Sequence, residues 1–324
     1  MRAIVIKQHG GPEVLAMEER PDPIPTPDQV LIEVKAFGLN HAESYFRSGG
    51  WANSAQITGI ECVGLVREDP SGHFAPGQTV LTLVGGLARS LNGSYAELVA
   101  APRTNVAAVK TPLSWEALAA IPESYGTAWT AVMGILALER DQTLLIRGAT
   151  SALGQAAINI ALHAGAKVIA TTRSNDRRAI LEALGVHAVL IDTPNLSARL
   201  QTRPDAVLDI VGTTTILDSL AALRRGGRGC QVGFLGGGVA LNVEPVFQIP
   251  NGRYYSTFAS AAATGTPDFP LTEIPFQEIV ERVAAGIYAA KPSRVFRFDE
   301  QEIREAHRIL DQGRQTAKMV VRVG

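Results

Sequence analysis

The sequence contains only two cysteines, Cys62 and Cys230, among its 324 residues. Two cysteines cannot build a disulfide framework, so their scarcity argues against a disulfide-stapled secreted scaffold and favours a reducing compartment. They also lie far apart in the chain, so no Cys-x-x-Cys pair is available to hold a structural zinc ion. We therefore expect neither structural disulfides nor a thiolate zinc site.

Long charged runs and long apolar runs are also missing. The net charge is −1, without a stretch of Lys or Arg and without an acidic tail. The sequence thus lacks the clustered positive field that nucleic acid or an anionic membrane surface requires. No segment approaches the roughly 18 apolar residues of a spanning helix, and residues 1–7 alternate as a strand does, too short for a signal peptide. These absences predict a soluble, cytoplasmic protein without nucleic-acid or membrane partners.

The local texture of the sequence divides the chain into regions of different character. Residues 1–122 are broken at short intervals by proline and glycine, with short β-type runs between the breaks. Residues 123–263 alternate near-continuous apolar strands with helices, beginning with the strand 143–147 and the helix 151–164, which predicts a parallel sheet buried on both faces. Residues 264–324 return to two helices and a final strand. A chain of this length is expected to form two domains.

The strand 143–147 runs into the turn Gly148-Ala-Thr-Ser-Ala-Leu-Gly154, and a helix follows. Small residues at such a turn let the backbone approach a pyrophosphate, and the helix N-terminus supplies N–H donors and partial positive charge. The spacing departs from the Gly-x-Gly-x-x-Gly fingerprint, so a turn with only a packing role would look similar. The further strand candidates after it favour a dinucleotide-binding site.

The next strand ends in Thr171-Thr-Arg-Ser174 and has no carboxylate at its tip. NAD-binding units place an Asp or Glu about 20 residues after the glycine turn, where it holds the ribose 2′-hydroxyl. Arg173 and Ser174 can instead bind a 2′-phosphate, because a guanidinium matches phosphate geometry. The alternative is that Ser174 only caps the next helix while Arg173 is solvated. This pattern predicts NADP(H) rather than NAD(H).

Several motifs spread over nearly the whole length of the chain belong together. They are Gly38-Leu-Asn-His-Ala-Glu-Ser-Tyr-Phe-Arg-Ser-Gly49 and the stretches 59–64, 76–80, 93–97, 120–129 and 225–228. In these motifs the chain resembles the medium-chain dehydrogenase/reductase superfamily, specifically its zinc-free quinone oxidoreductase branch, the zeta-crystallin-like proteins. The resemblance implies an α/β protein with a GroES-like β domain, residues 1–122 and 264–324, and a Rossmann domain with a doubly wound parallel sheet, residues 123–263.

The zinc alcohol dehydrogenases of the same superfamily are the competing resemblance. They carry a Cys ligand where this chain has Asn40, and a His ligand where it has Ile60. Glu61 is retained, but a carboxylate without its neighbouring His is more typical of a structural role, and His41 alone does not make a metal site. The resemblance therefore implies an enzyme with no metal site.

Without a Lewis acid, a simple ketone is a poor hydride acceptor, whereas a quinone or an α,β-unsaturated carbonyl spreads the developing negative charge onto a distant oxygen. By resemblance, Asn40 and Tyr45 lie near the nicotinamide and donate hydrogen bonds to that oxygen, and Tyr125 is a second candidate proton source. Packing of either tyrosine beneath a loop is the alternative. We therefore predict an NADPH-dependent reductase of quinones or α,β-unsaturated carbonyls.

The resemblance also places cofactor-binding residues at the carboxyl ends of strands, where a doubly wound sheet binds its ligand. Ser151 and Ala152 stand where the family usually has glycine, and both are small enough for the cofactor to fit. The expected cofactor contacts are Thr127, Gly148, Ser151, Ala152, Leu153, Gly154, Thr172, Arg173, Ser174, Val211, Gly212, Gly233, Phe234, Leu235 and Phe258.

Two other functions remain open alongside the reduction of quinones or α,β-unsaturated carbonyls. One is a zinc-free reductase of enoyl thioesters, and the other is an NADPH-binding sensor or structural protein with little catalysis. The fold alone cannot separate these functions. Asn40 and Tyr45 argue against an inactive protein, and the near-zero net charge argues against an RNA-binding role. Family habit and an expected edge strand over residues 253–260 predict a homodimer.

Overall fold

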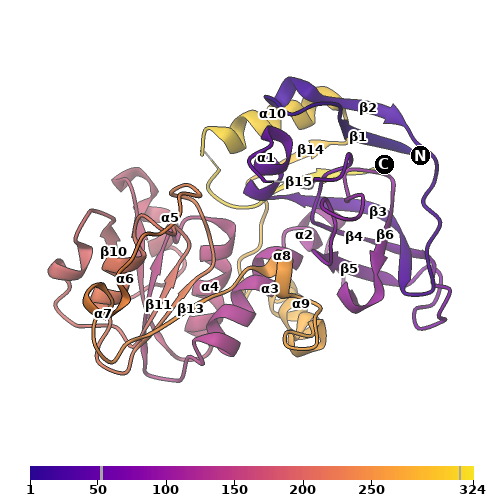
Figure 1. Ribbon diagram of the computed structural model, residues 1–324. Helices are drawn as coiled ribbons and strands as arrows, with labels where there is room; N and C mark the ends of the chain where they lie inside the picture. The colour runs from indigo at the N-terminus through magenta and orange to yellow at the C-terminus, as the bar shows by residue number, and fades with distance from the viewer. Residues whose placement is uncertain (52–53, 314) are drawn as a thin grey trace. The chain divides into compact units, whose positions relative to one another are not determined.

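The computed structural model describes residues 1–51, 54–313 and 315–324 (Figure 1). The chain forms two compact units. Unit 1 comprises Met1–Gly126 and Ala261–Gly324, and unit 2 comprises Thr127–Ser260. These limits differ from the predicted ones, 1–122 with 264–324 and 123–263, by four residues at the first boundary and three at the second. In the described part of the chain, every helix is too short or too polar to cross a membrane.

Unit 1 is built on a seven-stranded sheet of order β14-β15-β3-β4-β5-β7, in which β6 also pairs with β3. The long strand β3 is central because β6 pairs with its first half and β15 with its second half. A separate hairpin consists of β1 and β2. The strands are β1 (Arg2–Ile6), β2 (Leu15–Glu19), β3 (Gln29–Leu39), β4 (Glu61–Glu68), β5 (Thr79–Leu83), β6 (Leu98–Pro102), β7 (Val106–Ala108), β14 (Arg294–Arg297) and β15 (Met319–Arg322).

Short helices cap this sheet, and the longest of them comes from the C-terminal part of the chain, beside the yellow strands in Figure 1. Two helices matter for the site: α1 follows β3 directly, and α3 leads into unit 2. The helices are α1 (His41–Ser48), α2 (Trp115–Leu118), α3 (Pro122–Trp129), α8 (Ser260–Ala263), α9 (Phe276–Ala284) and α10 (Glu300–Asp311).

A network of buried hydrogen bonds and one ion pair connects α1 to α10. Arg47 on α1 lies 3.0 Å from His307 Nδ1 and pairs with Asp311 at 2.8 Å. Since a guanidinium only donates, His307 Nδ1 accepts, and the ring hydrogen sits on Nε2 and is donated to the Tyr95 hydroxyl at 3.1 Å. Burial, reinforced by the charge of Arg47, lowers the pKa of His307 to about 3, so the ring stays neutral. The orientation of α1, which carries predicted site residues, is thereby fixed from the core side.

Unit 2 contains a six-stranded sheet of order β10-β9-β8-β11-β12-β13, and every neighbouring pair is parallel. In chain order this is 3-2-1-4-5-6, the doubly wound arrangement, so the predicted α/β Rossmann fold is confirmed. The strands are β8 (Thr143–Arg147), β9 (Lys167–Thr172), β10 (Ala188–Ile191), β11 (Ala206–Asp209), β12 (Arg228–Gln231) and β13 (Tyr254–Thr257).

The helices of unit 2 connect these strands. The predicted strand 143–147 is β8, whose Leu144, Leu145 and Ile146 are fully buried. The predicted helix 151–164 is α4, with Ser151 as its N-cap. The helices are the π-helical segment Thr130–Ile135, α4 (Ala152–His163), α5 (Arg178–Glu182), α6 (Ile216–Ala222) and α7 (Pro245–Gln248).

Candidate active site

Asn40 stands at the junction of β3 and α1, where it is the N-cap residue of the helix. Its backbone N–H donates to Glu43 Oε2 at 2.5 Å, so Glu43 at position N3 satisfies the start of the helix. The other carboxyl oxygen of Glu43 accepts the N–H of Ile60 at 3.2 Å. Glu43 therefore links the beginning of α1 to the segment that enters β4.

The Asn40 side chain lies among three buried ionisable groups. Its Oδ1 accepts from Lys318 Nζ at 2.5 Å, and its Nδ2 donates to Glu61 Oε1 at 2.8 Å. Lys318 forms an ion pair with the same carboxylate of Glu61. The second oxygen of Glu61 accepts the backbone N–H of Glu123 at the start of α3, at 2.8 Å. We call Asn40, Glu43, Glu61 and Lys318 the Lys318 cluster.

Burial changes the protonation of one member of the Lys318 cluster. Glu43 is fully buried, and desolvation raises its pKa to about 8, against the opposing charge of Lys318 and the N–H donors of Asn40 and Ile60. The negative charge of Glu61 adds to the increase. At neutral pH the cluster thus holds a largely protonated Glu43 beside the Glu61–Lys318 ion pair, close to electrical neutrality.

Tyr45 lies on the same short helix as Asn40. Its ring stacks on Trp51 with centroids 5.0 Å apart and meets His41 edge-on at 5.2 Å. The side chain is partly buried, and burial raises the pKa of its hydroxyl. The structure therefore brings Asn40 and Tyr45 onto one element, with Tyr45 held in an aromatic row.

The structure places Tyr125 differently from the prediction of a proton source. The ring is buried and stacks on Tyr288, and the hydroxyl donates to the backbone carbonyl of Ala289 at 3.0 Å. In this structure the Tyr125 hydroxyl is therefore engaged with a main-chain acceptor. The packing alternative describes Tyr125 better.

In unit 2, the glycine turn between β8 and α4 is closed by Ser151. Its hydroxyl donates to the Gly148 carbonyl at 2.8 Å and accepts the N–H of Gly154 at 3.1 Å. The hydroxyl is thus used within the turn itself. Ala152 and Leu153 form the first turn of α4, whose N-terminal N–H groups are suited to an anion.

Gly154 is required by close packing at this turn. A Cβ atom at this position would lie 2.6 Å from the Ala149 carbonyl oxygen. We expect Gly154→Ala to lower the free energy of unfolding of unit 2 by about 1–3 kcal/mol, the cost of overpacking a tight site, and to weaken dinucleotide binding. Gly134→Ala is the matched control, because a Cβ there would meet no atom closer than 4.0 Å. Equal thermal denaturation and nucleotide affinity of the two variants would contradict this role of Gly154.

The end of β9 presents Thr172, Arg173 and Ser174. Arg173 is exposed, and among the residues that the structure describes no carboxylate pairs with its guanidinium. Ser174 occupies an N-cap position, but its side chain makes no capping hydrogen bond. The capping alternative for Ser174 is therefore not realised, and both side chains remain available to an anionic ligand.

The other predicted cofactor residues follow the ends of β11, β12 and β13. Val211 and Gly212 donate their N–H groups to the buried carboxylate of Asp209 at 2.9 and 2.8 Å. Gly233, Phe234 and Leu235 follow β12, and the last two are partly exposed. Thr127 and Phe258 are instead buried.

Sequence reasoning missed a buried ion network at the same edge of the sheet. Arg147, the last residue of β8, is 1% exposed and donates to Asp192 after β10 and to Asp218 on α6, the latter at 2.8 Å. Ser219 bonds both Arg147, at 3.3 Å, and Asp209, at 2.6 Å. The signal available in the sequence was an arginine that ends an otherwise apolar strand, directly before the glycine turn.

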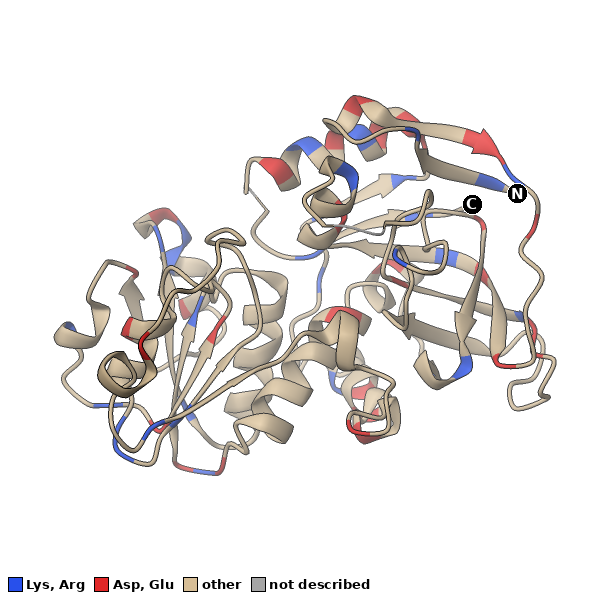
Figure 2. Ribbon diagram, viewed as in Figure 1, with Lys and Arg blue, Asp and Glu red and all other residues tan. Residues whose placement is uncertain are grey.

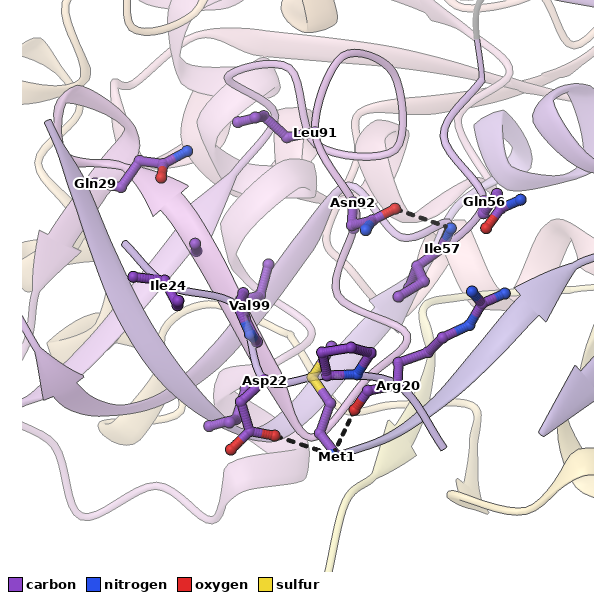
Figure 3. A pocket seen from close by; sticks show the side chains of 15 residues that line it. Met1, Arg20, Asp22, Ile24, Gln29, Gln56, Ile57, Leu91, Asn92 and Val99 are labelled. Atoms are coloured by element: carbon purple, nitrogen blue, oxygen red, sulfur yellow. Dashed lines mark hydrogen bonds and ion pairs between the residues drawn. The ribbon is translucent and has the colours of Figure 1, made fainter. Parts of the chain in front are cut away.

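A cavity in unit 1 lies away from these residues. It measures about 430 Å³ and is lined by residues that include Arg20, Asp22, Gln56, Asn92 and Val99 (Figure 3). None of the predicted site residues lines it. Acidic and basic residues are interspersed along the ribbon of both units (Figure 2). Within residues 1–51, 54–313 and 315–324, no three His, Cys, Asp or Glu side chains are placed to hold a metal ion together.

Comparisons with known proteins cover both units. Residues 26–111 match the alcohol dehydrogenase GroES-like domain family, which confirms that part of the fold prediction, and residues 152–271 match the zinc-binding dehydrogenase family. The quinone oxidoreductase of Homo sapiens is 27% identical, with 99% of this chain and 97% of that protein aligned.

Solved structures resemble the whole chain. An NAD-dependent alcohol dehydrogenase is 29% identical with a TM-score of 0.81, and the alignment covers 100% of both chains. The quinone oxidoreductase of Escherichia coli, solved in complex with NADPH, is 23% identical with a TM-score of 0.86 and covers 99% of this chain and all of that one. The second likeness is one of fold.

Proposed function

Because the chain belongs to the medium-chain dehydrogenase/reductase superfamily, in its quinone oxidoreductase branch, we propose that it is an NADPH-dependent reductase that passes hydride to a quinone or an α,β-unsaturated carbonyl without a metal ion. The observation that carries this proposal is the Lys318 cluster. In this cluster the partly exposed residue is Asn40, which carries an amide. The positive charge of the cluster belongs to the buried ammonium of Lys318. Such a site offers hydrogen bonds to a substrate oxygen.

The residues of unit 2 suit the binding of NADPH, which supplies the hydride when bound. The N–H groups at the start of α4 would bind the pyrophosphate, and Ser151 holds the turn in shape. Arg173 and Ser174 at the end of β9 would bind the 2′-phosphate. The complexes with NADPH of related folds support this choice of cofactor.

Residues of unit 1 would donate hydrogen bonds to the substrate oxygen that accepts the developing negative charge. Asn40 Nδ2 has two hydrogens, of which one is held by Glu61 at 2.8 Å and the other faces Glu43 at the long distance of 3.4 Å. The second hydrogen would be donated to the oxygen on which negative charge develops. Tyr45, five residues along, would donate to the same oxygen and recover its proton from water. One hydride and one proton complete the two-electron reduction.

Turnover assays test this function directly. Purified protein is titrated with NADPH and NADH, and cofactor oxidation is followed with 1,4-benzoquinone and 9,10-phenanthrenequinone, with and without a chelator. We expect tighter binding of NADPH and quinone-dependent turnover that the chelator leaves unchanged. Loss of activity on chelation would contradict the metal-free mechanism, and binding without turnover would favour an enoyl thioester substrate or a sensory role.

Arg173→Ala is expected to weaken NADPH binding about 10-fold to 100-fold, because that loss of affinity corresponds to one charge-assisted hydrogen bond to phosphate. NADH has no 2′-phosphate, so its binding should stay nearly unchanged. Fluorescence titration of both nucleotides measures the effect. Arg178→Ala is the matched control, because Arg178 is a neighbouring arginine that pairs with Glu182 at 2.8 Å. An equal loss for the two nucleotides would mean that Arg173 does not contact the 2′-phosphate.

We further propose that the chain forms a homodimer through β13. This strand is at the edge of its sheet and pairs with β12 on one side. Apolar side chains on it and on the preceding helix α7 are exposed, including Tyr254 at 66% and Phe247 at 87%. Light scattering should give the mass of a dimer, and Tyr254→Glu with Phe247→Glu should give that of a monomer. A monomeric parent protein would refute this assembly.

A further inference from the structure

Lys318 is buried immediately before β15, although it is a charged residue with a long side chain. It is only 5% exposed. A Cβ atom at Gly38 on β3 would overlap the Cε atom of Lys318, so the glycine leaves the space through which the lysine stem passes. The ammonium emerges between Asn40 and Glu61. The surrounding residues therefore leave space for the buried Lys318 side chain, whereas most lysines are exposed to solvent.

Two neighbours of Asn40, Lys318 and Glu61, each select the orientation of its amide. An asparagine amide has two nearly isosteric orientations, with the oxygen and nitrogen exchanged. An ammonium only donates, so it can face only Oδ1, at 2.5 Å. A carboxylate only accepts, so Glu61 can face only Nδ2, at 2.8 Å. Both constraints select the same orientation, and the ion pair between Lys318 and Glu61 holds the two partners together.

Asn40 is the member of the Lys318 cluster that reaches the surface. Glu43, Glu61 and Lys318 are buried, whereas Asn40 is partly exposed. A ligand therefore meets this cluster through the Asn40 amide. The edge that the amide presents depends on Lys318, which is itself too deeply buried to touch the ligand.

We propose that Lys318 is a positioning residue, which orients the Asn40 amide so that its N–H edge is available to the acceptor oxygen of the substrate. The proposal rests on the proposed function of Asn40 as hydrogen-bond donor. Without the ammonium, Glu61 alone opposes the orientation in which the Asn40 oxygen faces the substrate and two oxygens repel each other, so that orientation becomes more populated. The role of Lys318 is exerted through Asn40 alone.

The kinetic test is a double-mutant cycle on Lys318→Met and Asn40→Ala. We expect Lys318→Met to lower kcat with 9,10-phenanthrenequinone about 10-fold to 100-fold, part of the effect of removing a donor to a developing oxyanion, without changing the affinity for NADPH. In the Asn40→Ala background the same substitution should have no further effect on kcat. Additive losses, or an unchanged kcat in Lys318→Met, would overturn the proposal.

Two further variants separate this role from a loss of folding. Lys318→Met leaves Glu61 without its counter-charge, so the pair Lys318→Met/Glu61→Gln is prepared as well, in which no unpaired charge is buried. This pair should fold and show the same low kcat, and recovery of the parent kcat would refute the role. Lys35→Met is the control, since Lys35 is partly exposed and pairs with Glu33 on the surface.

A spectroscopic measurement distinguishes this proposal from the proposed function. The side-chain amide signals of Asn40, assigned by their loss in Asn40→Asp, are compared by NMR in the parent protein and in Lys318→Met/Glu61→Gln. We expect sharp amide signals in the parent, where one orientation is held, and shifted or exchange-broadened signals in the variant, where the two orientations interconvert. Identical signals would refute the role of Lys318 even if quinones are reduced. A change in the signals would support it even if no quinone is turned over.

Discussion

Arg147→Met is expected to lower the free energy of unfolding of unit 2 by about 3–5 kcal/mol, the cost of removing one partner from a buried ion pair. The guanidinium of Arg147 is bonded to both Asp192 and Asp218, and these carboxylates are 12% and 19% exposed. Methionine fills much of the same volume but leaves both carboxylates without a cation. Chemical denaturation followed by circular dichroism measures the change.

Two comparisons identify the cause of this destabilisation. Arg224→Met removes a surface ion pair with Asp205 in the same unit, and such pairs contribute about 0.2–1 kcal/mol. The triple variant Arg147→Met/Asp192→Asn/Asp218→Asn removes the unpaired charges as well and should regain most of the stability. If the triple variant were as unstable as Arg147→Met, lost packing rather than unpaired charge would be responsible.

Asn40→Ala is expected to lower kcat with a quinone about 100-fold to 1000-fold, as the loss of an oxyanion donor does, while NADPH affinity stays the same. Asn40 forms a capping box with Glu43 at the start of α1, so the substitution should also lower the free energy of unfolding by about 0.5–2 kcal/mol, which thermal denaturation measures separately. Steady-state kinetics and nucleotide titration separate the two parameters.

Asn92→Ala is the matched control for this variant. Asn92 also lies in unit 1, where it accepts the N–H of Ile57 at the edge of the cavity in Figure 3. It should retain the parent kcat. A kcat of Asn40→Ala within about twofold of the parent, well short of the loss expected for an oxyanion donor, would show that Asn40 does not bind the developing charge, and Tyr45 would become the main candidate.

Local patterns in the sequence predict the core of unit 2 well. The apolar run that forms β8 and the small residues of the turn before α4 are local features, because strand burial and close backbone approach each demand particular residue types. The position of Asn40 at the end of β3 also follows from the motif around it. Local patterns do not show which partner a side chain bonds. The hydroxyl of Ser151, for example, bonds the carbonyl of Gly148 within its own turn.

The contacts that sequence reasoning could not foresee join residues that lie far apart in the chain. Arg147 finds its carboxylates 45 and 71 positions later, and Lys318 meets Asn40 across 278 positions. No spacing rule connects residues so far apart. Tyr125 illustrates the converse, because its sequence context cannot show that the hydroxyl is bonded to the carbonyl of Ala289.

The discontinuity of unit 1 also has a consequence for biosynthesis. Unit 2 is one uninterrupted stretch, Thr127–Ser260, so it can fold as soon as that stretch has left the ribosome. Unit 1 must wait for β14 and β15 to join β3, and these contacts span most of the chain. Lys318 follows the whole of unit 2 in the chain, so Glu61 is still without its counter-charge when unit 2 is already able to fold. A chain that stalls just after Ser260 would therefore present a folded unit 2 and an incomplete unit 1.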